Sequence, residues 1–377
     1  AIMMPLLMNV MLTAFPVERR GTAMGFFGLV MFTAPAVGPT LSGWIVENYS
    51  WRLLFGLVLP FAIMTLIYGV FKLRNITPNR DVDLDVISMV LSALGFGGLL
   101  YGFSTAGEAI NGWGSLDVVI TLSVGSLSLL IFIIRQIKMK EPMLDFKIYK
   151  YSMFALASII SIVISVALFS GMLLTPLYVQ TVRDISPVQS GLLMLPGAII
   201  MGIMSPITGR LFDKYGPRTL AITGLTITTV MTFFLSRLDL DISYGNLMLI
   251  YTIRMFGLSM VSMPIMTNGL NQLPMPSYPH GTAINNTLQQ VSGAIGSAFL
   301  LTIMTKRTEH TALQVTQTYE STDQMTSFQI QQEIEKIALL DGINFSFFIS
   351  TILIVIALIL TFFVKRVKSP SKELKAT

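Results

Sequence analysis

Long apolar runs, separated by short polar stretches, follow one another along almost the whole chain. A helix needs about 20 largely apolar residues to cross the hydrocarbon core of a membrane. Ten runs reach that length, and a shorter run at the start forms part of one more. The runs cover residues 1–15, 22–46, 53–71, 86–105, 117–135, 152–180, 188–209, 219–236, 244–270, 282–305 and 343–364. Because lipid cannot satisfy the backbone of an open strand, we expect an all-α, polytopic membrane protein.

The composition narrows the functional class. Hydrophobic residues make up 53% of the chain and charged residues 12%, which excludes a soluble globular domain. The absence of cysteine excludes disulfides, thiolate metal sites and cysteine nucleophiles. The two histidines, His280 and His310, cannot build a histidine-rich metal centre, and no G-x-x-x-x-G-K-[ST] loop indicates nucleotide hydrolysis. Basic residues are dispersed among short loops, so we expect no nucleic-acid partner. Because the sequence also lacks the metal-ligand and nucleotide-binding patterns named above, we expect no cofactor, no metal and no enzymatic activity.

The loops alternate between rich and poor in Lys and Arg. One set, which includes the C-terminal tail, holds 18 of the 25 basic residues, and the other set holds six. Because basic loops remain on the cytoplasmic side of a membrane, this asymmetry predicts a cytoplasmic C-terminus. Arg254 is the remaining basic residue and lies within a span.

Two distant passages of the chain resemble each other. A Met-Pro pair, an Asn and a Gly-Thr-Ala occur at 4, 5, 9 and 21–23 and recur at 263, 264, 268 and 281–283. Internal duplication is typical of transporters built from two repeats about a central site. The copies lie eight spans apart instead of six, which indicates two extra helices between the halves. We therefore expect fourteen spans in the intact protein, about eleven of them present here, with the natural N-terminus missing.

This count divides the chain into three parts. Residues 1–71 would be spans four to six of an N-terminal six-helix half, and residues 72–151 two inserted helices with cytoplasmic loops. Residues 152–377 would be a complete C-terminal six-helix half that ends in a basic tail. With three spans absent, the central cavity would lack part of its wall, so we expect that this fragment alone does not transport.

The stretch 306–342 is predicted to be a long outer loop. Within it, Ile330, Ile334 and Ile337 recur at helical spacing among Gln and Glu. One interpretation is an amphipathic helix that lies on the outer surface as a lid. The alternative is a solvated loop whose short helix packs on the rim of the bundle.

A polar segment with two glycines joins the spans at 188–209 and 219–236. We single out Gly209, Arg210, Asp213, Lys214, Gly216 and Arg218. The glycines permit a tight turn, and Asp213 would precede the next helix, where a carboxylate interacts favourably with N-terminal amides. The segment resembles the G-x-L-x-D-R-x-G-R-R signature of the major facilitator superfamily. The resemblance implies a conformational-switch loop that latches the halves on the cytoplasmic side, and the alternative is a generic basic turn.

A second motif strengthens this resemblance. Gly25, Gly38, Pro39 and Gly43 fit the G-x8-G-x3-G-P-x2-G-G antiporter pattern, although Ala34 and Ser42 each replace a glycine. The chain is similar to the fourteen-span drug/proton antiporters, in particular the lincomycin and quaternary-ammonium efflux branch. The resemblance implies that this helix belongs to the interface between the halves. Ordinary close packing of small residues is the alternative.

Several polar and flexible residues are candidates for a substrate cavity. They are Asn9, Phe32, Arg254, Met260, Asn268, Asn285 and Gln289. Arg254 either has a partner or wet cavity inside the bundle, or its side chain extends toward the outer interface. The amides either bind substrate and water or form interhelical hydrogen bonds. Met and Phe surfaces adapt to varied ligands, but packing is the alternative for each of them.

The resemblance implies a monomeric exporter in a bacterial cytoplasmic membrane. It would move small lipophilic drugs, cationic or neutral, by alternating access, with the proton gradient as its energy source and membrane lipids around it. None of the 20 Asp and Glu residues falls clearly at mid-membrane. The resemblance implies a coupling carboxylate in the first span, which is among the missing ones. The alternatives are a transporter of a physiological lipid, siderophore or peptide, and a membrane sensor or scaffold that moves nothing.

Overall fold

The structure is a computed structural model, and it describes residues 38, 41–72, 85–106, 112–319 and 327–367. Regular structure in these residues consists of helices, and nine of the described helices are long and apolar enough to cross a membrane. Residues 41–48 are also helical. The long helices are α3 (Arg52–Lys72), α4 (Val86–Ala106), α5 (Leu116–Lys138), α6 (Ser152–Leu177), α7 (Pro187–Tyr215), α8 (Pro217–Leu235), α9 (Tyr244–Asn271), α10 (Tyr278–Tyr319) and α11 (Ser327–Thr361). This architecture confirms the all-α membrane fold.

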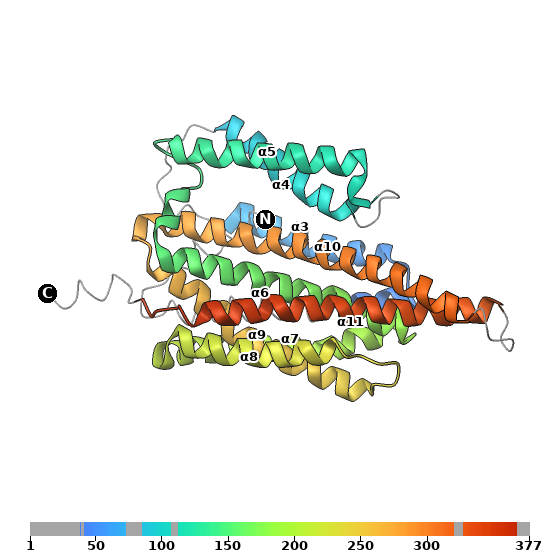
Figure 1. Cartoon of the computed structure of the whole chain (residues 1–377). Helices are drawn as coiled ribbons and strands as arrows, with labels where there is room; N and C mark the ends of the chain where they lie inside the picture. Colours follow the sequence, from blue (N-terminus) through green and yellow to red (C-terminus); the bar gives the residue numbers. More distant parts are fainter. Residues whose placement is uncertain (1–37, 39–40, 73–84, 107–111, 320–326, 368–377) are drawn as a thin grey trace.

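Helices α6 to α11 form one bundle (Figure 1). Helix α9 packs against α6, α7 and α8, while α10 and α11 pack against each other and against α6. The core between them is apolar, and Leu174, Leu193 and Leu258 are fully buried in it. Local chemistry sets the helix starts: Ser186 and Ser243 each accept a hydrogen bond from a first-turn backbone N–H, and proline occupies the first turn of α7.

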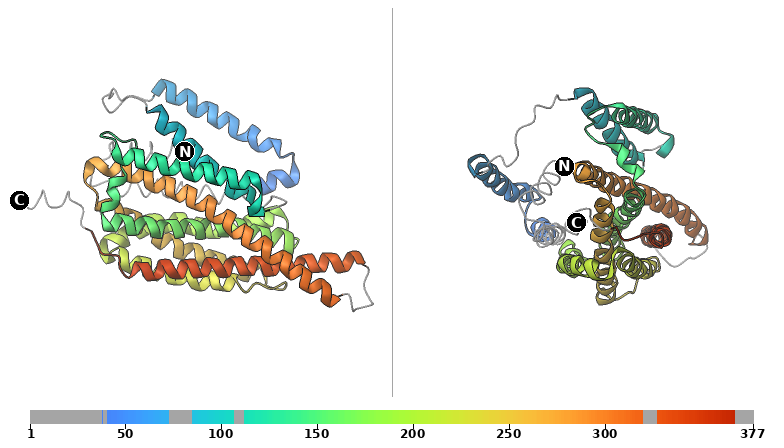
Figure 2. Two further views of the ribbon diagram at one scale, coloured as in Figure 1. Left: turned by 45° about the horizontal axis from the view of Figure 1, so that its top comes forward. Right: turned by 90° about the vertical axis from the view of Figure 1, so that its left-hand side faces the viewer.

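The helix pair α4–α5 lies beside this bundle and touches it through α10 (Figures 1 and 2). The two helices approach closely where glycines face each other. A Cβ added to Gly98 would lie 2.9 Å from the Gly125 Cα, and one added to Gly125 would lie 2.7 Å from the Leu99 backbone nitrogen. Much of the rest of the pair's surface is exposed and apolar, as expected of helices that face lipid.

Charged groups join the ends of α4 and α5. Asp85, directly before α4, forms an ion pair with Arg135 in the last turn of α5, with 3.0 Å between Arg135 Nη2 and Asp85 Oδ1. Hydrogen bonds from Arg135 and from Ser88 lower the pKa of the Asp85 carboxyl from 3.8 to about 2. Gln136 donates to Ser88 Oγ at 2.8 Å and accepts from the Leu144 backbone N–H at 3.0 Å, so the network also holds the following connection.

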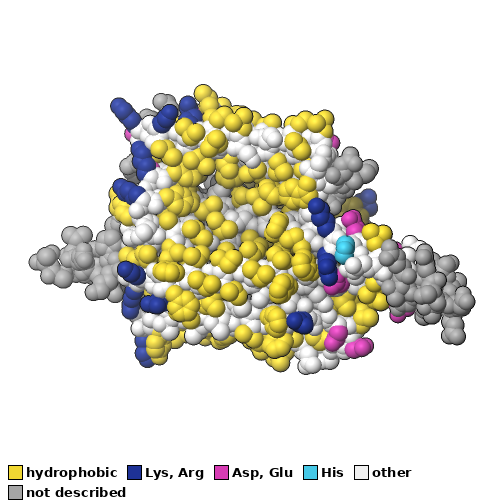
Figure 3. Space-filling model, in the orientation of Figure 1, with side chains coloured by type: hydrophobic (Ala, Val, Ile, Leu, Met, Phe, Trp, Pro, Cys, Tyr) yellow, Lys and Arg dark blue, Asp and Glu magenta, His cyan; other side chains and the backbone are white. Residues whose placement is uncertain are grey.

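Lys and Arg gather at one end of the molecule, where α5 and α11 finish and α6 and α8 begin (Figure 3). We call this the basic end, and the opposite end, where α10 and α11 project beyond their neighbours, the hairpin end (Figure 1). The two ends correspond to the predicted cytoplasmic and outer sides, respectively.

The prediction of a long loop over 306–342 is wrong. Helix α10 continues to Tyr319 and α11 begins at Ser327, so most of this stretch extends the two membrane helices. The sequence from Leu300 to Tyr319 holds no Gly or Pro, so nothing breaks the helix where its composition turns polar. Ile334 is buried and belongs to α11, so neither the surface lid nor the solvated loop describes this segment.

Side chains fix the two projecting helices to each other and to the bundle. Asp341 Oδ2 accepts from Arg307 Nε and from Thr311 Oγ1, both at 2.6 Å. A Cβ on Gly342 would lie 2.6 Å from the Met304 carbonyl oxygen, which shows how closely α10 and α11 pack. Lys336 of α11 forms an ion pair with Asp184 in the α6–α7 connection.

Backbone clamps hold both ends of the six-helix bundle. At the hairpin end, Asn344 of α11 exchanges two hydrogen bonds with the Leu238 backbone, at 3.0 and 2.8 Å. At the basic end, Asn268 of α9 donates to the Lys365 carbonyl and accepts from the Val367 N–H, both at 3.0 Å. The six helices are therefore joined by polar contacts as well as by their apolar core.

Candidate functional site

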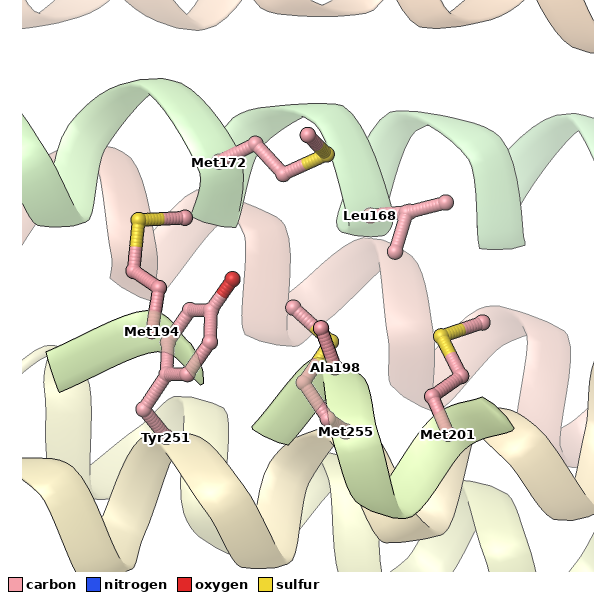
Figure 4. Close-up of a pocket in the computed structure, with 7 residues that line it drawn as sticks. All are labelled: Leu168, Met172, Met194, Ala198, Met201, Tyr251 and Met255. Carbon is pink, nitrogen blue, oxygen red and sulfur yellow. The ribbon is translucent and has the colours of Figure 1, made fainter. Parts of the chain in front are cut away.

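A small cavity lined by methionines lies between α6, α7 and α9 (Figure 4). Its volume is about 40 Å³. The lining consists of Leu168, Met172, Met194, Ala198, Met201, Tyr251 and Met255. No side chain in this lining is charged. We call it the methionine cavity; its thioethers are flexible and polarizable, which suits apolar ligands of varied shape.

A second cavity, of about 250 Å³, lies toward the hairpin end. The helix at 41–48 contributes Ser42, Gly43 and Val46, and α6 with its continuation and α7 contribute Pro176, Gln180, Pro187, Ser190, Gly191 and Met194. We call it the junction cavity, because it separates the predicted first half of the chain from the second. Its polar groups are neutral, and Gln180 Nε2 donates to Ser190 Oγ at 3.2 Å.

At the antiporter-motif residue Gly43, the helix at 41–48 approaches the start of α7 closely. A Cβ on Gly43 would lie 2.7 Å from the Pro187 carbonyl oxygen, so any larger side chain would push the helix at 41–48 away from α7. Gly38 is exposed, and no described atom lies within 4 Å of the position of its Cβ. Gly25 and Pro39 lie outside the described residues.

Arg254 is completely buried in the core between α6, α8 and α9. Its Nε donates to Thr232 Oγ1 of α8 at 3.0 Å, and its Nη2 donates to the Ala167 carbonyl of α6. Nη1 packs against Gly171 and has no hydrogen-bond partner among the described residues. The interpretation in which this side chain reaches the outer interface is therefore wrong. Arg254 has partners inside the bundle, but it lines neither cavity.

Among the described residues, the other predicted cavity residues also lie away from both linings. Asn268 clamps the segment after α11, and Met260 packs against Gly224 of α8. Asn285 is buried, with an amide nitrogen that has no partner in the described part of the chain, and Gln289 is half-buried. Asn9 and Phe32 fall outside the described residues.

The switch-loop residues occupy a helix end more than a loop. Gly209, Arg210 and Lys214 belong to the last turns of α7, which ends at Tyr215. Gly216 alone makes the turn, with φ +79°, and α8 starts at Pro217, directly before Arg218. The backbone of Asp213 therefore lies in the last turn of α7, and Gly216 is the N-cap of α8. The predicted interaction of the Asp213 carboxylate with the N-terminal amides of α8 stays a prediction. The Arg366 side chain lies over the turn, 3.5 Å from the position of a Cβ on Gly216.

The methionine cavity was missed by sequence reasoning, although a signal existed. Leu168, Met172, Pro176 and Gln180 recur every four residues along α6 and its continuation, and so share one helix face. Met194, Ala198 and Met201 repeat the pattern on α7. Two consecutive antiparallel helices with matching stripes of this kind would have indicated a shared furrow between them.

Comparison with known proteins identifies relatives over most of the chain. The family model described as Major Facilitator Superfamily matches residues 1–297. An uncharacterized transporter of this type from Bacillus subtilis (strain 168), YhcA, is 43% identical, and the match covers 97% of this chain and 74% of that protein. The lincomycin resistance protein LmrB of Listeria innocua is 47% identical over 81% of this chain and 64% of its own length.

A solved structure shares the fold at low sequence identity. It is a crystal structure of a bacterial homolog to the human lysosomal transporter Spinster, in an inward-facing and occupied conformation. The TM-score is 0.55 with 12% identity, and the match covers 94% of this chain and 72% of that one.

Proposed function

The chain belongs to the Major Facilitator Superfamily, and from this premise we propose that it exports amphipathic, lipophilic small molecules by alternating access. The family membership confirms the resemblance drawn from its motifs and makes the protein a transporter and not an enzyme. Three of its relatives with at least 42% identity are named lincomycin resistance proteins. These names support drugs as the cargo.

The methionine cavity is the observation that carries the proposal. It lies inside the six-helix bundle, and flexible apolar side chains without any charge line it. Such a lining favours apolar molecules of varied shape over one polar metabolite, because adaptable thioether contacts replace fixed hydrogen bonds. The protein would act as a monomer in the cytoplasmic membrane, with the basic end inside and the proton gradient as its energy source.

Transport by the complete coding sequence tests this function. A drug-hypersensitive bacterium that expresses it should accumulate less lincomycin and less of a lipophilic dye than the empty strain. A protonophore should abolish the difference within minutes, because it removes the gradient without unfolding the protein. Dye binding to the purified protein with no flux under an imposed pH gradient would indicate a sensor. Unchanged accumulation of every drug would indicate a physiological cargo.

Orientation can be tested separately, because the chain lacks cysteine and single cysteines can be introduced. Lys138→Cys marks the basic end and Lys336→Cys the hairpin end. In intact cells, a membrane-impermeant maleimide should label only Lys336→Cys. The reverse pattern would overturn the proposed topology and leave the cargo undecided.

A further inference from the structure

The methionine cavity and the junction cavity share one residue, Met194. Its side chain is buried, with 4% exposed, and lies between the two spaces. On α6 and its continuation, Leu168 and Met172 line the methionine cavity, and Pro176 and Gln180 line the junction cavity on the same helix face. The two cavities are therefore consecutive parts of one furrow between α6 and α7.

The chemistry of the furrow changes along its length. Four methionines and Tyr251 surround its inner part. Its outer part offers neutral hydrogen-bonding groups from Gln180 and Ser190, and none of the residues that line either part is charged. Gln180 lies in a π-helical turn, Tyr178–Val182, that follows Pro176. Turns of this kind are frequent at functional sites because they displace side chains from the regular helix positions.

Size gives the second argument. Pockets for drug-sized molecules are typically about 300–1,000 Å³. The methionine cavity of about 40 Å³ is far too small, and the junction cavity of about 250 Å³ falls short as well. Joined by a movement of Met194, the two would approach that range. Methionine is unbranched and has three rotatable bonds, so it can make this movement more easily than Leu or Ile.

We propose that the α6–α7 furrow binds uncharged amphipathic molecules, with Met194 as the gate between two subsites. The apolar body occupies the methionine cavity, and a neutral donor or acceptor, such as a carboxamide, lies at Gln180 and Ser190. This inference rests on the proposed function and specifies its substrate class. It also separates the recognition groups from Arg254, which stays in the core.

Photolabelling of the purified full-length protein in lipid nanodiscs tests the two subsites. The probes are 4-methylbenzophenone, which is apolar, and 4-benzoylbenzamide, which adds a carboxamide to the same body. Both should label α6, α7 and α9 around the methionine cavity, as read by mass spectrometry of the peptides. Labelling outside the furrow would overturn the proposal.

Substitutions at the outer subsite should affect only one of the probes. Gln180→Leu and Ser190→Ala should each weaken binding of the carboxamide probe about three- to tenfold, which is the usual effect of a lost neutral hydrogen bond. Binding of the methyl probe should stay within twofold. Gln189→Leu is the matched control, because Gln189 is exposed and lies next to Ser190 on α7. It should change the binding of neither probe. Equal weakening of both probes would contradict a polar subsite.

A substitution of Met194 tests its role as the gate. Met194→Ala should join the cavities, so that the carboxamide probe labels Met172 and Met255 more strongly than in the wild type. Met89→Ala, an exposed methionine on α4, controls for the loss of a reactive thioether. An unchanged labelling pattern in Met194→Ala would contradict the role of Met194 as a gate. These assays do not depend on transport. If the furrow is labelled but no transport is found, only the proposed function is refuted. If transport is found but the furrow is not labelled, only this inference is refuted.

Discussion

Arg254 shows how a single residue can be placed on the right helix and still be misjudged from sequence. Its position ten residues into a span predicts a costly buried charge, and the structure gives it partners on α6 and α8. Neither partner could be predicted, because Ala167 accepts through its backbone carbonyl and Thr232 is one of many span threonines. The space at Gly171 completes the site and leaves no sequence signal beyond a glycine.

Gly171→Ala should destabilise the protein. The added methyl group would overlap the Arg254 guanidinium, and overpacking of this kind costs about 1–3 kcal/mol. The measurement is the fraction of monodisperse protein left after heating, read by size-exclusion chromatography with fluorescence detection. Gly245→Ala is the control, because nothing lies within 4 Å of that Cβ, and it should be neutral or slightly stabilising. Equal melting of both variants would contradict the close packing of the guanidinium.

At the scale of single elements, apolar runs predict the helices well and their ends poorly. The runs at 86–105 and 117–135 differ from α4 and α5 by a few residues, because lipid favours an uninterrupted apolar helix. The runs at 282–305 and 343–364 are shorter than α10 and α11, because hydropathy alone sets their limits. Helix propensity and packing at Gly342 carry both helices past the point where their composition becomes polar.

The α10–α11 pair should depend on packing more than on charge. Gly342→Val would place a branched side chain against the Met304 carbonyl, and we expect a loss of about 1–3 kcal/mol. Asp341→Asn removes the ion pair with Arg307, but both side chains are more than a third exposed, so we expect a loss below about 1 kcal/mol. Thermal unfolding midpoints of the two variants test this, and Gly342→Val should unfold at the lower temperature. A lower midpoint for Asp341→Asn would contradict the explanation by packing.

The α4–α5 pair should respond to acid. The Asp85 pKa is lowered to about 2 from 3.8 in the folded protein, so the stabilising contribution is present above about pH 4 and is lost as the pH falls through 2. Hydrogen exchange of residues 85–92 should accelerate over this range. In Asp85→Asn the exchange should be faster at pH 6 and should change less with acid. If hydrogen exchange in Asp85→Asn depended on pH as it does in the wild type, the ion pair between Asp85 and Arg135 would not stabilise the α4–α5 pair.

On the scale of the whole molecule, the six-helix bundle α6–α11 is a unit held by clamps at both ends. In the described contact between it and the helix at 41–48, Gly43 lies directly against the backbone at the start of α7. A motif in the sequence predicted that this helix packs closely, but only the structure shows that, among the described residues, a backbone lies against Gly43 and not against Gly38. Distances between separate halves depend on tertiary packing, which residue spacing within one helix does not encode.

This difference predicts unequal effects of the same substitution. Gly43→Leu should separate the helix at 41–48 from the start of α7 and lower transport by the complete protein at least tenfold, with membrane insertion unchanged. Gly38→Leu should have the smaller effect, because no described atom lies within 4 Å of its Cβ. Drug efflux at matched expression gives the ranking. Spin-label distances between residues 46 and 188 should lengthen only in Gly43→Leu, and equal distances would contradict the argument.

The projecting ends of α10 and α11 have a practical consequence for imaging. A small membrane protein that is hidden in a detergent micelle offers single-particle microscopy few features by which to align images. Here two long helices continue beyond the bundle to Tyr319 and from Ser327 without changing direction (Figure 1). A small helical protein inserted between these residues, in register with both, would turn with the bundle as one rigid body. The hairpin end is therefore a natural place for an alignment marker that leaves both cavities untouched.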